Sequence, residues 1–309
     1  MHHLQSGESM AEKRLIAGGA EQQDSYSRHL STLLPSGPQK LWRPHGGARY
    51  GLDDLVVGCL TTYSTYRGRA DVVRATWWQH LRHAYFYGDV ADASLPITPY
   101  ASLDERWAGA DAAFLREDIM RADYGSSLPK FFMALLDLFL RHPHRQWYLL
   151  VGDDNFVVPQ HLLELLDGID AAHKYIVGGP LGQHVGLGAY ASGGSGLLFS
   201  NGFMQAAWRH LGPFAVSWRQ GRGQHLLCHP CADVAFGFFA RDVGAVTVEV
   251  ECMHGMWPEY FAMHTSRDLP SCAAVPNRPR IKCARPATFH YVQPRAMRLL
   301  SRHFFPPQR

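Results

Sequence analysis

The stretch WYLLVGDDNFVV, residues 147–158, decides how this chain of 309 residues folds. An apolar run of strand length ends in two adjacent carboxylates, and a second apolar run follows. Burial of Leu149 and Val151 would fix the first run in a core, whereas a charge buried without a partner costs several kcal/mol. We therefore expect Asp153 and Asp154 at the exposed carboxyl end of a buried strand, where open α/β sheets bind their ligands.

Two interpretations of the pair Asp153-Asp154 are open. The acids cap a turn or the helix predicted at residues 159–166, or they bind a hard divalent cation that in turn holds a phosphate. The residues that follow, 155–158, make a poor turn sequence, which favours the cation.

Strand-like and helix-like segments alternate on both sides of this stretch. We predict strands at residues 55–60, 84–87, 147–151, 175–177, 245–251 and 288–292, and helices at 69–81, 128–140, 159–166 and 229–240. This alternation indicates an α/β fold with a mainly parallel central sheet flanked by helices. Residues 1–46 are polar and without period, and we interpret them as a mobile arm.

Composition excludes two classes of partner. The formal net charge is only +3 and no basic stripe is visible, so we expect no nucleic acid. No stretch approaches the roughly 18 apolar residues that a membrane span requires. We therefore expect no membrane span in this chain.

The six cysteines leave the redox compartment open. Cys59 lies in an apolar run and is predicted to be a buried free thiol. Cys228 and Cys231 have the spacing of half a zinc site, but no second pair follows. Cys272 and Cys283 flank a loop rich in Pro and Arg, which a disulfide would close in an oxidising compartment.

Three further features carry candidate chemistry, each with a plainer alternative. Gly193 and Gly194 would let the backbone approach a ligand, or they form a tight turn before a strand. Asp233 lies among apolar neighbours that would raise its pKa towards that of a general base, or it is a first-turn helix acid. His290 lies in a predicted strand as a ligand, or as a hydrogen-bonded core histidine.

Taken together, the features occur in the order of a known family. From residue 54 to about 300 the chain resembles the fringe and core-1 β1,3-galactosyltransferase family of inverting glycosyltransferases. The motifs that carry the resemblance are Thr61-Thr62, Arg67-Gly68-Arg69, Thr76-Trp77, Lys130, residues 147–157, 175–180, 190–200 and 230–237, His254 with Pro258-Glu259, and Phe289-His290-Tyr291-Val292 with Met297 and Leu300.

The resemblance implies a fold and an activity. The fold is a GT-A-type nucleotide-sugar transferase domain over residues 47–309, with a donor half at about 54–180 and an acceptor half at about 181–300. A UDP-sugar donor would be held through Mn²⁺ or another divalent cation. The sugar would move, with inversion, to a hydroxyl of a glycan, glycoprotein or small molecule, giving a β-linkage that is expected to be β1,3.

The resemblance also assigns roles residue by residue. Asp154 and His290 match the metal ligands, and Asp233 matches the catalytic base. Donor contacts are expected from Thr61, Thr62, Arg69, Lys130, Asp153, Gly193 and Gly194. We place the acceptor near Trp218, His254 and Trp257.

The chain departs from the family pattern at two positions. Gly152 stands where a first acidic residue is usual, and Ala232 replaces the first Asp of the segment at 230–237. These departures motivate a rival hypothesis, a catalytically inactive protein that binds nucleotide sugar or carbohydrate. A metal-dependent hydrolase is a third hypothesis. The family resemblance implies the Golgi lumen if an anchor has been removed, and otherwise the chain is expected to be cytoplasmic.

Overall fold

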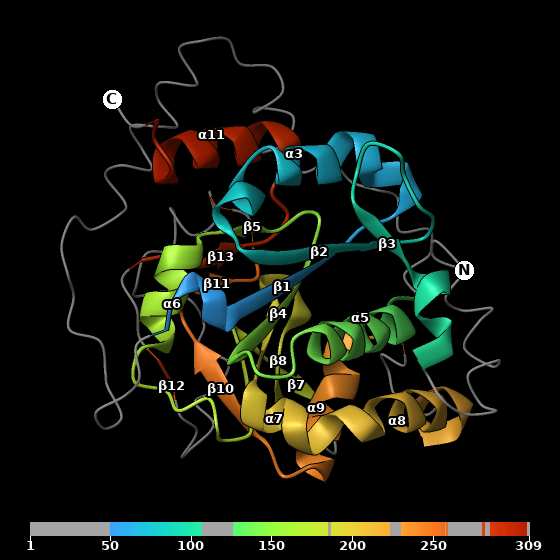
Figure 1. Cartoon of the computed structure of the whole chain (residues 1–309). Helices are drawn as coiled ribbons and strands as arrows, with labels where there is room; N and C mark the ends of the chain where they lie inside the picture. Colours follow the sequence, from blue (N-terminus) through green and yellow to red (C-terminus); the bar gives the residue numbers. More distant parts are fainter. Residues whose placement is uncertain are drawn as a thin grey trace, which may run out of the picture.

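An eight-stranded sheet forms the centre of the protein (Figure 1). The computed structural model describes residues 50–106, 126–184, 187–222, 230–256, 258, 280–281 and 285–307, and the arm predicted at 1–46 lies outside them. In spatial order the strands are β12 (Arg280–Ile281), β10 (Val246–Val250), β6 (Tyr175–Gly178), β9 (Leu197–Ser200), β4 (Trp147–Gly152), β1 (Leu55–Leu60), β2 (His83–Gly88) and β3 (Ile97–Pro99).

The sheet is mainly parallel, as the sequence predicts. Strand β9 pairs antiparallel with both β4 and β6, and the other pairings in this sheet are parallel. Two small sheets accompany it. One contains β11 (Met253–His254), β13 (Thr288–Phe289) and β5 (Phe156–Val157), and the other contains β7 (Leu181–His184) and β8 (Gly188–Ala191).

Alternation along the strands divides the interior into two cores. In β4, Trp147, Leu149 and Val151 belong to one core, whereas Tyr148 and Leu150 belong to the other. This follows from the two-residue period of a strand, which sends successive side chains to opposite faces. The aliphatic side chains Leu149, Leu150 and Val151 each stabilise the fold by about 1.5–3 kcal/mol when fully buried. The strand predicted from residues 147–151 is thus confirmed as a central, doubly covered strand.

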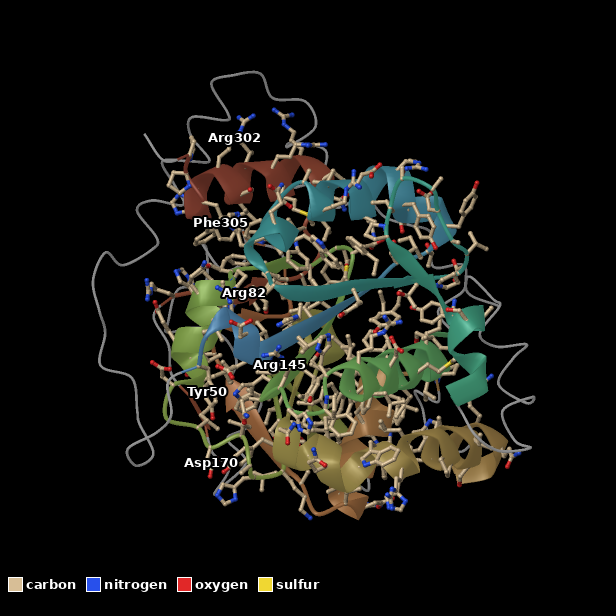
Figure 2. All side chains as sticks on the ribbon, viewed as in Figure 1. Tyr50, Arg82, Arg145, Asp170, Arg302 and Phe305 are labelled. Atoms are coloured by element: carbon tan, nitrogen blue, oxygen red, sulfur yellow. The ribbon has the colours of Figure 1, made fainter. Side chains whose placement is uncertain are left out.

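Helices cover both faces of the sheet (Figure 1). One face is covered by α5 (Ser127–Arg141), α7 (Asn201–Ala207), α8 (Leu211–Ser217) and α9 (Ala232–Asp242). The other is covered by α3 (Asp71–Arg74), α6 (Pro159–Leu166) and α11 (Pro294–Phe304). Figure 2 shows side chains filling both interlayer spaces, with Arg302 on the outer side of α11. None of the described helices is long and apolar enough to cross a membrane.

Short helical turns complete the described structure. They are η1 (Leu52–Asp54), η2 (Tyr63–Thr65), η3 (Tyr66–Ala70), η4 (Trp77–His80), η5 (Tyr100–Arg106), η7 (Gly193–Ser195), η8 (Trp208–His210) and η9 (Trp218–Arg222).

The continuous helix predicted at residues 69–81 is wrong. The segment is divided into the π-helical turn η3, the single turn α3 and the 3-10 turn η4. The Thr76 hydroxyl donates to the carbonyl of Val72 at 2.7 Å, a local bond that competes with regular helix. The chain then turns Trp77 into the core, where its indole Nε1 donates to the carbonyl of Asn155 at 3.0 Å.

The strand predicted at residues 288–292 is shorter than expected. Strand β13 ends at Phe289, and Tyr291 has a φ of 54°, which a continuing strand does not allow. His290 therefore lies in the bend after the strand, with its ring tilted by 31° against that of Tyr291 at a centroid distance of 3.7 Å.

The structure excludes the zinc site considered for Cys231 and confirms the free thiol predicted at Cys59. Cys59 is a buried free thiol, as expected. Cys231 and Cys252 are each disulfide-bonded. Half a zinc site at Cys231 is thereby excluded, because a disulfide sulfur is not a thiolate ligand. Cys228, Cys272 and Cys283 lie outside the described residues.

Candidate active site

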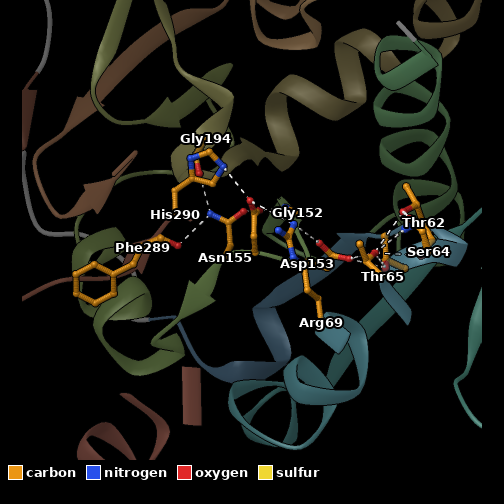
Figure 3. Close-up of polar contacts among 12 residues, drawn as sticks. Thr62, Ser64, Thr65, Arg69, Gly152, Asp153, Asn155, Gly194, Phe289 and His290 are labelled. Atoms are coloured by element: carbon orange, nitrogen blue, oxygen red, sulfur yellow. Dashed lines mark hydrogen bonds and ion pairs between the residues drawn. The ribbon is translucent and has the colours of Figure 1, made fainter. Parts of the chain in front are cut away.

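The carboxyl ends of β1, β2 and β4 meet at one edge of the sheet. Register pairs Leu60 with Gly152 on one side and with Tyr87 on the other. The residues that follow these strands are consequently neighbours in space, although they are far apart in the sequence. This edge brings Thr61 against Asp153, and Figure 3 shows the polar contacts that develop from there.

Asp153 is buried, in contrast to the exposed position expected from the sequence. Its side chain is 9% exposed, and its Oδ2 accepts hydrogen bonds from the hydroxyls of Thr61, at 2.7 Å, and Thr65. Arg69 Nη1 lies 3.6 Å from Oδ1. Burial raises the pKa of Asp153, and the two hydroxyls and Arg69 oppose that rise. The sequence argument failed here because it did not foresee these donors.

Asp154 and His290 face one another across the site. His290 Nε2 lies 3.6 Å from Asp154 Oδ2, and Arg69 Nη1 lies 3.9 Å from the same oxygen. The other imidazole nitrogen, Nδ1, is 3.3 Å from the carbonyl oxygen of Gly255. Donation from Nδ1 to that carbonyl leaves the Nε2 lone pair of the neutral ring directed at Asp154, which is how metal-binding histidines are usually oriented.

The donor atoms of this pair fit a divalent cation. Bonds of about 2.1 Å to one small divalent ion place neighbouring ligand atoms about 3 to 3.5 Å apart. The distance of 3.6 Å between Asp154 and His290 is close to that range. Among the described residues, no group of three or more His, Cys, Asp or Glu side chains could hold a metal. Further ligands would have to come from water or from the phosphates of a substrate.

The pair Asp153-Asp154 does form a turn, contrary to the sequence argument. Asn155 N donates to the Gly152 carbonyl at 3.1 Å, which closes the turn. A Cβ on Gly152 would lie 2.8 Å from Asp154 Oδ1, so a side chain at 152 would displace that carboxylate. The turn and the cation interpretations are therefore compatible, because the turn gives Asp154 its position.

Gly193 contacts Asp233, and Gly194 contacts His290. Gly193 N donates to Asp233 Oδ2 at 2.9 Å. A Cβ on Gly194 would lie 2.6 Å from His290 Nδ1, which only glycine avoids. The turn η7 thus holds the predicted base on one side and the predicted metal ligand on the other. A contact of these glycines with a donor stays a prediction.

Asp233 is a first-turn acid of α9 and also a member of the site. Besides the bond from Gly193, its Oδ1 accepts from Val234 N at 2.9 Å. Two backbone N–H groups therefore support the carboxylate. The sequence had suggested instead that the carboxylate would be isolated among apolar side chains. The interpretation of Asp233 as a first-turn helix acid is confirmed, and its catalytic role stays a prediction.

Lys130 is buried in an ion pair, whereas the sequence comparison predicted a cation that contacts the donor. Its Nζ donates to Asp89 Oδ1 at 2.9 Å, and its side chain is only 6% exposed. The other oxygen of Asp89 accepts from Tyr63 N at 3.0 Å, beside the Thr61-Thr62 segment. In that segment, Thr62 Oγ1 contacts the hydroxyls of its own turn rather than Asp153.

Two of the residues predicted near the acceptor, Trp218 and His254, pack against other aromatic rings. Trp218 is fully buried and stacks on Phe214 at 5.6 Å, so its ring offers no surface to an acceptor. His254 stacks on Phe289 at 5.5 Å, and burial lowers its pKa to about 3. Trp257 lies outside the described residues.

Three polar residues of the site were missed in the sequence. Thr65 donates to Asp153, Asp89 pairs with Lys130, and Asn155 bonds to the segments around it. Asn155 carried a signal, because an amide inside the apolar run after Asp154 must find partners for every polar atom when buried. For Thr65 and Asp89 the sequence offered no comparable signal.

Comparison of the sequence with known protein families gives one match. A family model described as Fringe-like matches residues 50–257. No curated protein matches the sequence.

Two solved structures show distant likenesses to this chain. Mouse xyloside xylosyltransferase 1, in its apo form, is 11% identical with a TM-score of 0.43, over 68% of this chain and 90% of that one. The apo form of the glycosyltransferase GlyE of Streptococcus pneumoniae TIGR4 is 11% identical with a TM-score of 0.39, over 77% of this chain and 54% of that one. The family match, rather than these likenesses, assigns the chain.

Proposed function

The chain belongs to the Fringe-like family of glycosyltransferases, and from this premise we propose a metal-dependent inverting transfer from a UDP-sugar to an acceptor hydroxyl. The product would carry a β-linkage, with β1,3 as the first linkage to test. The mainly parallel sheet flanked by helices agrees with the GT-A-type fold that the family implies.

The observation that carries the proposal is the pair Asp154 and His290. A carboxylate oxygen and an imidazole nitrogen, brought from segments 136 positions apart (290 − 154), face each other at 3.6 Å. Mn²⁺ held there would neutralise the diphosphate as it leaves. Arg69, whose Nη1 lies 3.9 Å from the same carboxylate, would contact the diphosphate as well.

Asp233 supplies the second half of the proposal. As general base it would take the proton from the acceptor hydroxyl, while the hydroxyl oxygen bonds to the anomeric carbon. The bond from that carbon to the diphosphate breaks, and its electron pair leaves with the diphosphate. One displacement of this kind inverts the configuration. Gly193 orients the carboxylate for this step through its bond to Oδ2.

The test is the release of UDP from a panel of UDP-sugars with Mn²⁺ and with a chelator. Asp154→Ala should reduce the release at least about 100-fold, because a metal supplies several kcal/mol and each 1.4 kcal/mol is about tenfold. Asp53→Ala, at the opposite end of β1, is the matched control and should retain the parent rate. Equal rates in the parent and in Asp154→Ala would overturn the proposal.

Two other results would assign a different function. Binding of UDP and Mn²⁺ without turnover, over all donors and acceptors, would indicate an inactive binding protein, the hypothesis that Gly152 and Ala232 motivate. Release of free sugar that needs no acceptor would indicate a hydrolase. Product analysis in the same assay distinguishes these results from transfer.

A further inference from the structure

Asn155 is buried at the centre of the site and has no part in the chemistry described above. It is 1% exposed and follows directly after Asp153 and Asp154. An amide side chain in such a place must satisfy two N–H donors and a carbonyl acceptor. The partners it uses show what it does.

The Asn155 amide bonds to three separate segments (Figure 3). Its Nδ2 donates to the carbonyl of Gly194 at 2.7 Å and to that of Phe289 at 3.1 Å. Its Oδ1 accepts from Gly152 N at 2.9 Å. The Asn155 main-chain carbonyl is fixed in turn by Trp77. The amide therefore connects the end of β4, the turn η7 and the end of β13.

Each of these segments carries one functional candidate. Gly152 begins the turn that presents Asp154. Gly194 packs against the His290 ring, and its neighbour Gly193 donates to Asp233. Phe289 directly precedes His290. Two donors and one acceptor of a single side chain thus fix the spacing among the candidate metal ligands and the candidate base.

We propose that Asn155 is the positioning residue that sets the distance between Asp154 and His290, and hence the affinity of their site for the cation–UDP complex. The inference rests on the proposed function of that pair. Replacement by Asp removes both N–H donors and places a carboxylate against the carbonyls of Gly194 and Phe289. The two segments then separate from the end of β4, and the ligand pair opens.

The chain offers a matched control in Asn201, whose amide works in the same way away from the site. Its Nδ2 donates to the carbonyls of Pro143, at 3.0 Å, and Arg145, at 2.7 Å, near the amino end of β4. The experiment titrates UDP into the whole protein with Mn²⁺ by calorimetry, for the parent, Asn155→Asp, Asn155→Ala and Asn201→Asp. Unfolding in urea without metal measures the folded fraction of each protein.

Affinity per folded molecule should fall about 10- to 100-fold in Asn155→Asp, the usual effect of losing a group that orients metal ligands. A higher Mn²⁺ concentration should restore binding in this variant, whereas Asn201→Asp should bind as the parent does. Parent-like affinity in both Asn155 variants would overturn the inference alone. Absence of UDP and Mn²⁺ binding in the parent would overturn the proposed function as well.

Unfolding of both Asn155 variants would also count against the inference if Asn201→Asp stays folded. Asn155 would then be a residue needed for folding rather than one that tunes the site. Asn155→Ala is included because it removes the amide without adding a charge beside the two carbonyls.

Discussion

The two ends of the same parallel strands carry the same three residue types, with different consequences. At the amino end, Arg82 contacts Asp53 and His83 Nε2 lies 3.4 Å from it, with the Asp53 side chain 51% exposed. At the carboxyl end, Arg69 and His290 lie 3.9 and 3.6 Å from Asp154, whose side chain is only 20% exposed. In the described part of the chain no hydrogen-bond donor contacts the Asp154 carboxylate.

The difference shows that the presence of Asp, Arg and His side chains near one another does not by itself make a ligand-binding site. Asp53 and Arg82 are brought together from two short segments and pair at the surface, where such pairs contribute about 0–1 kcal/mol. His83 Nε2 lies beside them as a buried atom that makes no hydrogen bond among the described residues. Asp154, Arg69 and His290 come from three distant segments, and the fold holds them just beyond hydrogen-bond distance. That spacing preserves the capacity of the carboxylate and the imidazole to bind a ligand.

The largest effect on turnover is expected for a substitution in the site at the carboxyl end of the strands. Asp233→Asn removes the candidate base but keeps an oxygen that can accept from Gly193, so the fold should be retained. Turnover should fall about 10²- to 10⁴-fold, the usual contribution of general base catalysis, while UDP affinity stays unchanged. Asp53→Asn, the same change at the amino end, should leave turnover as it is. Similar rates in both variants, measured as UDP release, would remove Asp233 from the mechanism.

A second change tests whether the spacing at the carboxyl end is enforced. Gly194→Ala places a methyl group where only 2.6 Å separates it from His290 Nδ1, so the ring must move. We expect metal-dependent UDP affinity to fall about 10- to 100-fold. Gly221→Ala is the control, since its Cβ would meet nothing within 4 Å. Calorimetry decides, and unchanged affinity in Gly194→Ala would show that the spacing is not enforced there.

A third prediction extends the comparison to pH. The Nε2 atom of His254 is buried, and burial lowers the pKa of the ring to about 3. The unfolded chain takes up a proton at this residue below about pH 6.5, whereas the folded chain does so only near its own pKa, so acid favours unfolding.

Between pH 6.5 and 5 this difference should lower the free energy of unfolding by about 1.5 kcal/mol. His254→Phe keeps a ring stacked on Phe289 and should remove that part of the pH dependence. Urea unfolding at several pH values measures it. An identical pH dependence in the variant and the parent would show that His254 does not contribute.

The smallest effect is expected at the amino end. Arg82→Ala removes an ion pair whose partners are 62% and 51% exposed. The free energy of unfolding should change by no more than about 0.5 kcal/mol, and UDP release should not change. A loss of activity in this variant would mean that the two ends are coupled, contrary to the comparison drawn above.

The sequence predicted the regular part of the fold well. Strand 55–60 and helix 159–166 have the predicted bounds, because apolar period and helix-start signals are local properties. The helix at 69–81 failed because Trp77 is drawn into the core by contacts far along the chain. Tertiary contacts of this kind override local propensity.

The sequence named candidate residues for the site but not the bonds between them. The resemblance to a family pointed to Asp154, Asp233 and His290. The structure places Asp233 and His290 against the turn at Gly193-Gly194, and Asp154 lies 3.6 Å from His290. The donors to Asp153 and the bonds of Asn155 were not predictable, because they join segments up to 134 positions apart. No period or local motif encodes such distances.

The turn at Gly193-Gly194 has a consequence for anyone who redesigns this protein. One glycine supports the acid that would act on the acceptor, and the next limits the ring that would act on the donor. A library that varies this turn changes the contacts of the donor and of the acceptor at once. A variant with improved activity towards one substrate would then be missed if its activity towards the other falls. Diversity directed at the surfaces around the site, with these two glycines retained, lets acceptor choice evolve without disturbing the reaction itself.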